Sequence, residues 1–280
     1  MIIERYMSDK NLEKMKTDFR FLIKKVVGSK GELLLDLRTD YFNVYHRGNS
    51  LAKVVFRADG RYDVGIHQKF LDDTSVAIDP RFEAHRVEKA DDNYCLFRLS
   101  ASLLHPFFQQ KHLDQFMARI KKVNYGEEIT FEQQIISDNL DREDLIIIDR
   151  QITDKRMRNR MDMLALKQVE GNSNRYKFLV IEVKLGRNEE LSEGVAQQLE
   201  TYVDHIRNNF KDFKKCYETQ YMQKKSLELF KAPLHESIDV INEVDGCVLV
   251  VGYSGPAQDK IEKLKSKHPD IQVEERNLRL

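Results

Sequence analysis

The sequence predicts a mixed α/β protein with a smaller N-terminal α+β domain and a larger C-terminal α/β domain. In the N-terminal part, a helical pattern over residues 9–27 is followed by short alternating segments that predict an antiparallel meander. From residue 130 onward, the patterns come in the order helix, three strands, helix, strand. Residues 121–126 have the composition of a linker, so we place the two domains at residues 1–121 and 122–280.

Length and composition limit the classes of protein that fit. The 280 residues include 46 basic and 46 acidic side chains, 20 and 17 of them in residues 1–120. This balance excludes a strongly basic protein that coats nucleic acid non-specifically. A nucleic-acid-binding protein of this composition has to concentrate its positive charge locally. We expect a cytoplasmic protein without a membrane partner, because no apolar run is long enough to cross a bilayer and the start lacks a signal-peptide pattern. Three widely spaced cysteines predict neither a disulfide framework nor a metal knuckle.

In the N-terminal domain, the helix at residues 9–27 precedes strands predicted at 32–37, 41–46, 51–57 and 62–67. The aromatic stretch 41–46, flanked by arginines, suits either stacking on bases or packing in a core. A second amphipathic helix follows Pro106. His105 and His112 lack partners at a recognisable ligand spacing, so we interpret them as surface or packing residues.

In the C-terminal domain, Thr130 and Gln133 have the spacing of a capping box, which predicts a helix over residues 131–139. A β-branched run at 144–149 predicts a strand buried on both faces. Further along, we expect a long helix at 191–213, another at 218–230, a buried strand at 246–252, a helix at 257–267 and an edge strand at 271–274.

The two strands between these elements carry charged residues where core residues belong. Alternation places Glu182 and Lys184 on one face of the strand at 178–184, and Asp162 lies on the preceding strand, 161–168. A hairpin centred on Asn172 sets Asp162 opposite Glu182, and one centred on Ser173 sets it opposite Lys184. A hairpin centred between Asn172 and Ser173 would instead set Asp162 opposite Val183, on the other face of the sheet.

A divalent cation would relieve the repulsion between these two carboxylates. Mg²⁺ prefers oxygen ligands, so we expect it to be held by Asp162, Glu182 and the backbone carbonyl of Val183, with a phosphate completing the shell. Lys184 would orient or deprotonate the attacking water, or steady the charge that builds on the phosphate. We expect this lysine at the rim of the sheet, where its loss would leave the fold intact.

These residues, with Gln198 and Tyr202 one helical turn apart, resemble the motifs of the PD-(D/E)XK nuclease superfamily and its RecB-like branch. The resemblance implies a restriction endonuclease-like αβββαβ core and Mg²⁺-dependent phosphodiester hydrolysis, with Mn²⁺ able to substitute. It makes Asp162, Glu182 and Lys184 the motif residues, and it gives Gln198 and Tyr202 a part in lining the site. The proline that precedes the motif aspartate is replaced by Met161, a change that leaves the chemistry untouched.

Two further features are assigned by position. In the family, a glutamate of the preceding helix often reaches the metal or its water, and we give this role to Glu132, with Glu128 as the rival. The alternative is that Glu132 merely favours the positive end of its helix. Residues 154–160 are the clearest local positive patch, and they would either hold phosphates or form a solvated hairpin tip. The cations of this basic segment are Lys155, Arg156, Arg158 and Arg160.

The leading hypothesis is a metal-dependent nuclease acting on DNA in defence, restriction or repair. Its N-terminal domain would select substrate, mediate homodimerisation or contact a protein partner. The alternative is a nucleic-acid-binding or scaffolding module that keeps the nuclease fold without turnover. A sugar- or ester-hydrolysing enzyme built on two carboxylates leaves the lysine without a role and ranks lower.

Overall fold

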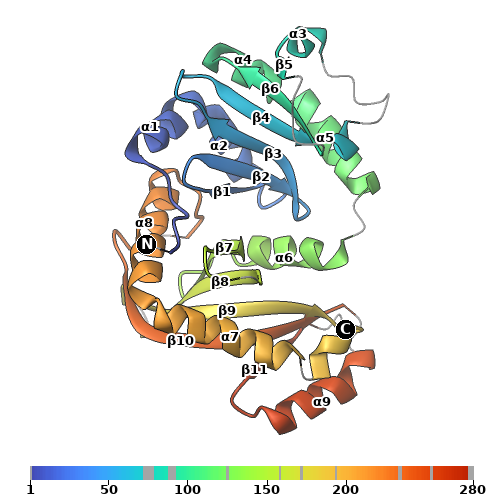
Figure 1. Cartoon of the computed structure of the whole chain (residues 1–280), viewed down its shortest axis with the longest axis vertical. Helices are drawn as coiled ribbons and strands as arrows, with labels where there is room; N and C mark the ends of the chain where they lie inside the picture. Colours follow the sequence, from blue (N-terminus) through green and yellow to red (C-terminus); the bar gives the residue numbers. More distant parts are fainter. Residues whose placement is uncertain are drawn as a thin grey trace. The chain divides into compact units, whose positions relative to one another are not determined.

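The computed structural model describes residues 2–71, 79–87, 93–123, 126–157, 159–170, 173–192, 194–232, 235–252 and 255–276. The chain forms two compact units (Figure 1). Unit 1 comprises residues 1–4, 139–222 and 231–280, and unit 2 comprises residues 5–138 and 223–230. The expected linker falls partly within helix α5, Gln110–Val123, and the next helix, α6, Glu127–Asp138, groups with unit 2.

In the described part of unit 2, six strands form one sheet in the order β1-β2-β3-β4-β6-β5, with every neighbouring pair antiparallel. This sheet contains the predicted meander, whose strands β2 and β4 have the predicted bounds. The strands are β1 Leu34–Leu37, β2 Tyr41–His46, β3 Asn49–Phe56, β4 Tyr62–His67, β5 Arg86–Val87 and β6 Tyr94–Leu99. The other helical elements are α1 Asp9–Asp18, α2 Arg20–Gly28, η1 Gln68–Phe70, α3 Pro80–Glu83 and α4 Ala101–Phe107.

The first helix differs from its prediction because it is broken at Phe19. The ring of Phe19 is fully buried and meets the rings of Phe42 and Tyr62 edge-on, at 4.8 and 4.9 Å. The chain leaves helical geometry at this residue, with φ −111° and ψ 7°, which lets the ring reach the sheet. Phe42 therefore belongs to the core. Of the two interpretations of residues 41–46, packing in a core is the one that holds for this face of β2.

The predicted start of α6 is wrong. The helix begins at Glu127, and the Thr130 hydroxyl donates to the Gly126 carbonyl at 2.9 Å, so it does not cap a helix that starts after it. The side chain of Gln133 bonds to other parts of unit 2, accepting from Gly48 N–H at 2.6 Å and donating to the Gly31 and Glu32 carbonyls. His112 is buried and bonds to the Phe107 carbonyl, as expected of a packing residue.

In the described part of unit 1, five strands form a mixed sheet in the order β11-β10-β9-β8-β7 (Figure 1). Strands β7, β8 and β9 pair antiparallel, whereas β10 pairs parallel to both β9 and β11. The helices between β9 and β10 supply the long connection that a parallel pair requires. The bounds are β7 Leu145–Ile152, β8 Met161–Gln168, β9 Arg175–Leu185, β10 Asp239–Val251 and β11 Gln272–Glu275, with α7 Gly194–Asn208, α8 Phe210–Ser226, α9 Gln258–Lys267, η2 Glu189–Ser192 and η3 Gly255–Ala257.

Helices α7 and α8 cover the sheet face to which Val180 and Glu182 point. Gly246 of β10 pairs with Val180, and a Cβ at this glycine would lie 2.8 Å from Leu199 of α7. Phe178, on the same face, packs edge-on against Tyr217 of α8. The Tyr217 hydroxyl donates to Asp149 of β7 at 3.2 Å. The two helices thus cover this face from β10 to β7.

The long helix expected at residues 191–213 is divided at Asn209. The backbone carbonyl of Asn209 accepts from the N–H groups of Asp212 and Phe213, at 3.0 and 3.2 Å, and so begins α8. Its side-chain amide donates to the His205 carbonyl at 2.8 Å, which satisfies one free carbonyl at the end of α7. Among the described residues, no helix combines the length and apolar character needed to span a bilayer.

Candidate active site

Asp162 and Glu182 lie on neighbouring strands at the same level. Met163 pairs with Ile181 and Leu164 with Val180, and continuing this register by one residue sets Asp162 opposite Glu182. This is one of the two registers that the site hypothesis required. The side chains are 8% and 1% exposed, so both carboxylates are buried. Asp162 Oδ2 accepts a hydrogen bond from Val183 N–H at 2.9 Å, which fixes its orientation beside β9.

The amino group of Lys184 lies between two carboxylates. Its Nζ is 3.0 Å from Glu182 Oε1 and 2.9 Å from Glu190 Oε2. Lys184 is only 5% exposed, so the expectation of a rim lysine is wrong: this ammonium is buried beside Glu182, whereas its second partner, Glu190, is largely exposed. Burial by itself would lower the pKa of Lys184, but the adjacent carboxylates outweigh it and raise the pKa above its usual range.

The pKa of the Asp162 carboxyl is shifted in this buried group of charges. Burial raises its pKa above the usual range, although the Val183 N–H and the positive charges of Lys184 and Arg160 act in the opposite direction. The charged form of Asp162 is therefore held at a free-energy cost in this site. An additional cation beside the carboxylates would reduce that cost.

Helix α7 brings Gln198 and Tyr202 to these strands. Gln198 Nε2 donates to the Tyr202 hydroxyl at 2.8 Å, and this hydroxyl donates to the Arg160 carbonyl at 3.1 Å. Tyr202 is fully buried, and burial raises its pKa, with a further contribution from the charges of Glu182 and Asp162. The glutamine and tyrosine thus join α7 to Arg160, the residue immediately before β8.

The basic segment is held against the C-terminal half of α7. Asp154 Oδ1 accepts from the N–H groups of Arg156 and Met157, both at 2.8 Å, and Oδ2 lies 2.5 Å from His205 Nε2. Arg156 Nη1 donates to Asn209 Oδ1 at 3.2 Å. Lys155, Arg156 and Arg160 are exposed, and Arg158 lies outside the described residues. The exposed cations are thus displayed by an anchored turn.

The other predicted metal ligands are placed as follows. A strand residue directs its N–H and C=O to the same side, so the Val183 carbonyl faces β8, as its N–H does. Glu132 is buried on α6 in unit 2, whereas the remaining predicted ligands belong to unit 1, and its part in a metal site stays a prediction. Glu128, the rival, lies on the same helix. Within the described ranges, no group of three or more His, Cys, Asp and Glu side chains could hold a metal.

Sequence reasoning missed two parts of this arrangement. Glu190, in the short 3₁₀ helix η2, reaches Lys184, but no periodicity marks a carboxylate six residues beyond a strand residue as its neighbour. The Asp154–His205 pair joins residues 51 positions apart. The spacing did hold one clue: His205 lies three residues after Tyr202 on the same helix, so both side chains can face residues 154–160.

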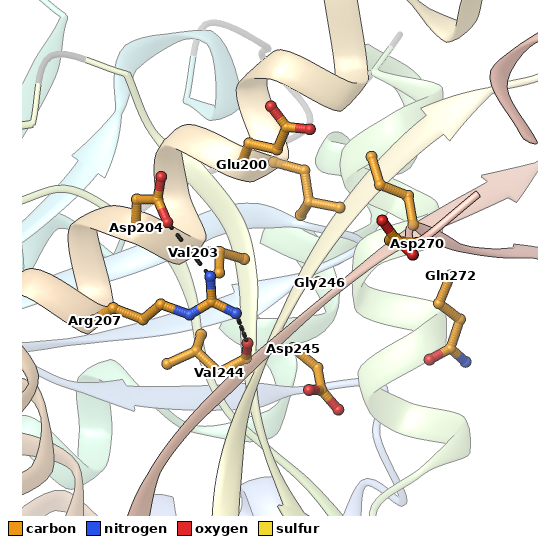
Figure 2. A pocket seen from close by; sticks show the side chains of 11 residues that line it. Glu200, Val203, Asp204, Arg207, Val244, Asp245, Gly246, Asp270 and Gln272 are labelled. Carbon is orange, nitrogen blue, oxygen red and sulfur yellow. Dashed lines mark hydrogen bonds and ion pairs between the residues drawn. The ribbon is translucent and has the colours of Figure 1, made fainter. Parts of the chain in front are cut away.

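A separate cavity of about 480 Å³ lies between α7, β10 and the turn before β11. Figure 2 shows the Arg207 guanidinium between Asp204 and Val244 in the cavity lining, with Nη1 3.4 Å from Asp204 Oδ1 and Nη2 donating to the Val244 carbonyl at 3.0 Å. The remaining lining mixes the acidic residues Glu200, Asp245 and Asp270 with apolar and small residues. None of the predicted site residues lines this cavity.

Comparisons of the chain with models of protein families, with curated proteins and with solved structures each found no match.

Proposed function

We propose that the protein is a metal-dependent nuclease of the PD-(D/E)XK type that hydrolyses phosphodiester bonds, with DNA as its substrate. The observation that carries the proposal is the placement of Asp162, Glu182 and Lys184 on two adjacent strands, with the ammonium 3.0 Å from the Glu182 carboxylate. Lysine and acidic side chains are rarely buried unless they are paired, and a buried cluster of two acids and a lysine on a sheet is a candidate site.

The donor set fits a hard divalent cation. Asp162 and Glu182 supply carboxylate oxygens, and the Val183 carbonyl faces β8, the strand that carries Asp162. Mg²⁺ is typically bound through one or two protein carboxylates together with waters and substrate phosphate, so a group of three acidic side chains is not required. When bound, such a cation supplies Lewis-acid stabilisation and lowers the pKa of a coordinated water. Mn²⁺ has the same preference for oxygen ligands.

The other residues have roles in positioning and charge stabilisation. Lys184 presents a positive charge next to the acids, where it can steady the negative charge that develops on a phosphate. Gln198 and Tyr202 fix the approach to β8 through the Arg160 carbonyl. The exposed cations of the basic segment are suited to the phosphates that flank the reacting one.

The test is a cleavage assay with Mg²⁺ or Mn²⁺ on linear, circular, single-stranded and branched DNA, with RNA in parallel. Asp162→Asn is the variant of choice, because the amide oxygen can still accept the Val183 N–H. We expect it to lower the cleavage rate by at least about 10²-fold. The matched control is Asp270→Asn, which makes the same change at an exposed turn residue and should cleave at the wild-type rate.

Two results would contradict the proposal. One is cleavage by the Asp162→Asn variant at the wild-type rate. The other is a wild-type protein that cuts no substrate in either metal; if it still binds nucleic acid, the non-catalytic binding module becomes the better explanation.

A further inference from the structure

We propose that Glu190 is a positioning residue of the site, which shares the Lys184 ammonium with Glu182 and so leaves Glu182 available to a divalent cation. The inference rests on the proposed function and adds a residue to it. Its basis is the placement of Lys184 Nζ, 2.9 Å from Glu190 Oε2 and 3.0 Å from Glu182 Oε1. One ammonium thus bridges a buried carboxylate and a largely exposed one.

Glu190 is held in place by its own short helix. Its N–H donates to Asn188 Oδ1 at 2.9 Å, and the next residue, Leu191, is fully buried. Lys260 of α9 braces the same segment, donating to the Asn188 carbonyl at 3.1 Å and lying 3.0 Å from Glu189 Oε1. The two adjacent glutamates of η2 therefore bind different lysines. Glu190 binds the buried Lys184, and Glu189 binds the helix lysine.

The second partner of Lys184 matters because a bound cation and the Lys184 ammonium would compete for the same carboxylate. A cation bound by Glu182 and the Lys184 ammonium both require the oxygens of Glu182. If Lys184 had only this partner, metal binding would leave a buried ammonium unpaired, which is strongly unfavourable. Glu190 provides a second partner whose side chain is 58% exposed and thus inexpensive to keep charged. The ammonium can then remain paired with Glu190 while Glu182 binds the metal.

Glu190 acts on the lysine and is not a metal ligand in this proposal. The described residues contain no three-carboxylate group that could hold a metal, so Glu190 does not complete a set with Asp162 and Glu182. Outer residues that orient the groups around a metal site commonly change metal affinity by about 10–100-fold when they are removed.

The experiment compares Glu190→Gln with Glu189→Gln in the full-length chain. Mn²⁺ binding is measured by calorimetry and by the loss of the free-ion signal in electron paramagnetic resonance. We expect Glu190→Gln to weaken Mn²⁺ binding about tenfold, because Lys184 then pairs with Glu182 alone. The control removes the same charge from the adjacent position, where the side chain is 92% exposed and bound to Lys260, and should change the affinity less than about twofold.

A second measurement separates action through Lys184 from a general loss of negative charge. In a Lys184→Met background, Glu190→Gln should no longer change Mn²⁺ affinity, because the group that joins Glu190 to Glu182 is gone. In the cleavage assay, Glu190→Gln should lower kcat and leave KM for DNA within about twofold, as expected for a positioning residue that acts through Lys184 and Glu182 and not on DNA binding.

The outcomes distinguish the two proposals. If the wild type binds Mn²⁺ and cleaves DNA but Glu190→Gln behaves like Glu189→Gln, the role of Glu190 is refuted and the nuclease proposal stands. An equal effect of Glu190→Gln in the presence and absence of Lys184 also refutes it. A wild type that neither binds Mn²⁺ nor cleaves nucleic acid removes the proposed function, and the role of Glu190 with it.

Discussion

Replacing Lys184 by methionine should destabilise the metal-free protein. Methionine keeps most of the length of the side chain and removes the ammonium, leaving Glu182, whose side chain is 1% exposed, without its 3.0 Å ion-pair partner. Breaking a buried ion pair from one side costs about 3–5 kcal/mol. The other partner, Glu190, is largely exposed and can be solvated after the change, so we take the lower end, about 3 kcal/mol. This corresponds to a decrease in Tm of about 6–12 °C for a domain of this size.

Urea and thermal unfolding in a metal chelator would measure this effect. The matched control is Lys260→Met, since Lys260 pairs with the exposed Glu189 and its loss should cost less than about 1 kcal/mol. The double variant Lys184→Met with Glu182→Gln should recover much of the lost stability, because the buried side chain that loses its ammonium partner is then neutral. A Lys184→Met variant as stable as Lys260→Met would refute the interpretation of a buried, mutually dependent pair.

Other parts of unit 1 allow three further predictions. Gly246→Ala should cost about 1–3 kcal/mol in urea unfolding, since its Cβ would lie 2.8 Å from Leu199, and a neutral result would contradict the close packing of α7 on β10. Although burial alone would raise the pKa of Asp154, two backbone N–H groups and a histidine hold it below its usual range, so its stabilisation is present above about pH 4 and lost at lower pH. The stability difference between wild type and Asp154→Asn should therefore shrink as the pH falls from 5 to 3, and a constant difference would be evidence against this. Replacing Arg156 and Arg160 by glutamine should weaken DNA binding for all sequences and reduce the salt slope by about two; an unchanged slope would indicate a solvated hairpin tip.

The strands were the most predictable part of this fold. Strands β2 and β4 have the predicted bounds, because alternating apolar residues and turn residues specify a half-buried strand locally. Helix ends were less predictable. The break at Phe19 accompanies a ring that packs against another element, whereas the break at Asn209 accompanies a local side-chain bond that closes the end of α7. The helical periodicity continues through both positions and gives no sign of either break.

The candidate site was predictable where it depends on strand geometry and not where it depends on loops. The period of two on β9 placed Glu182 and Lys184 on one face, and the turn composition limited Asp162 to two useful registers. The structure has the register that sets the acids opposite each other. The pairing of Lys184 with Glu190 was not predicted, because it depends on where the short helix η2 places that carboxylate.

The burial of Lys184 bears on why these charges occur together. A rim lysine would be a solvated cation that any mutation could replace at little cost. In the structure, Lys184 neutralises the buried Glu182, and burial raises the pKa of Asp162 despite nearby positive charge. Apolar residues of similar size would satisfy this sheet face at least as well. Fold stability therefore does not by itself account for the arrangement, whereas the proposed site for a cation and a phosphate would use both the acids and the ammonium.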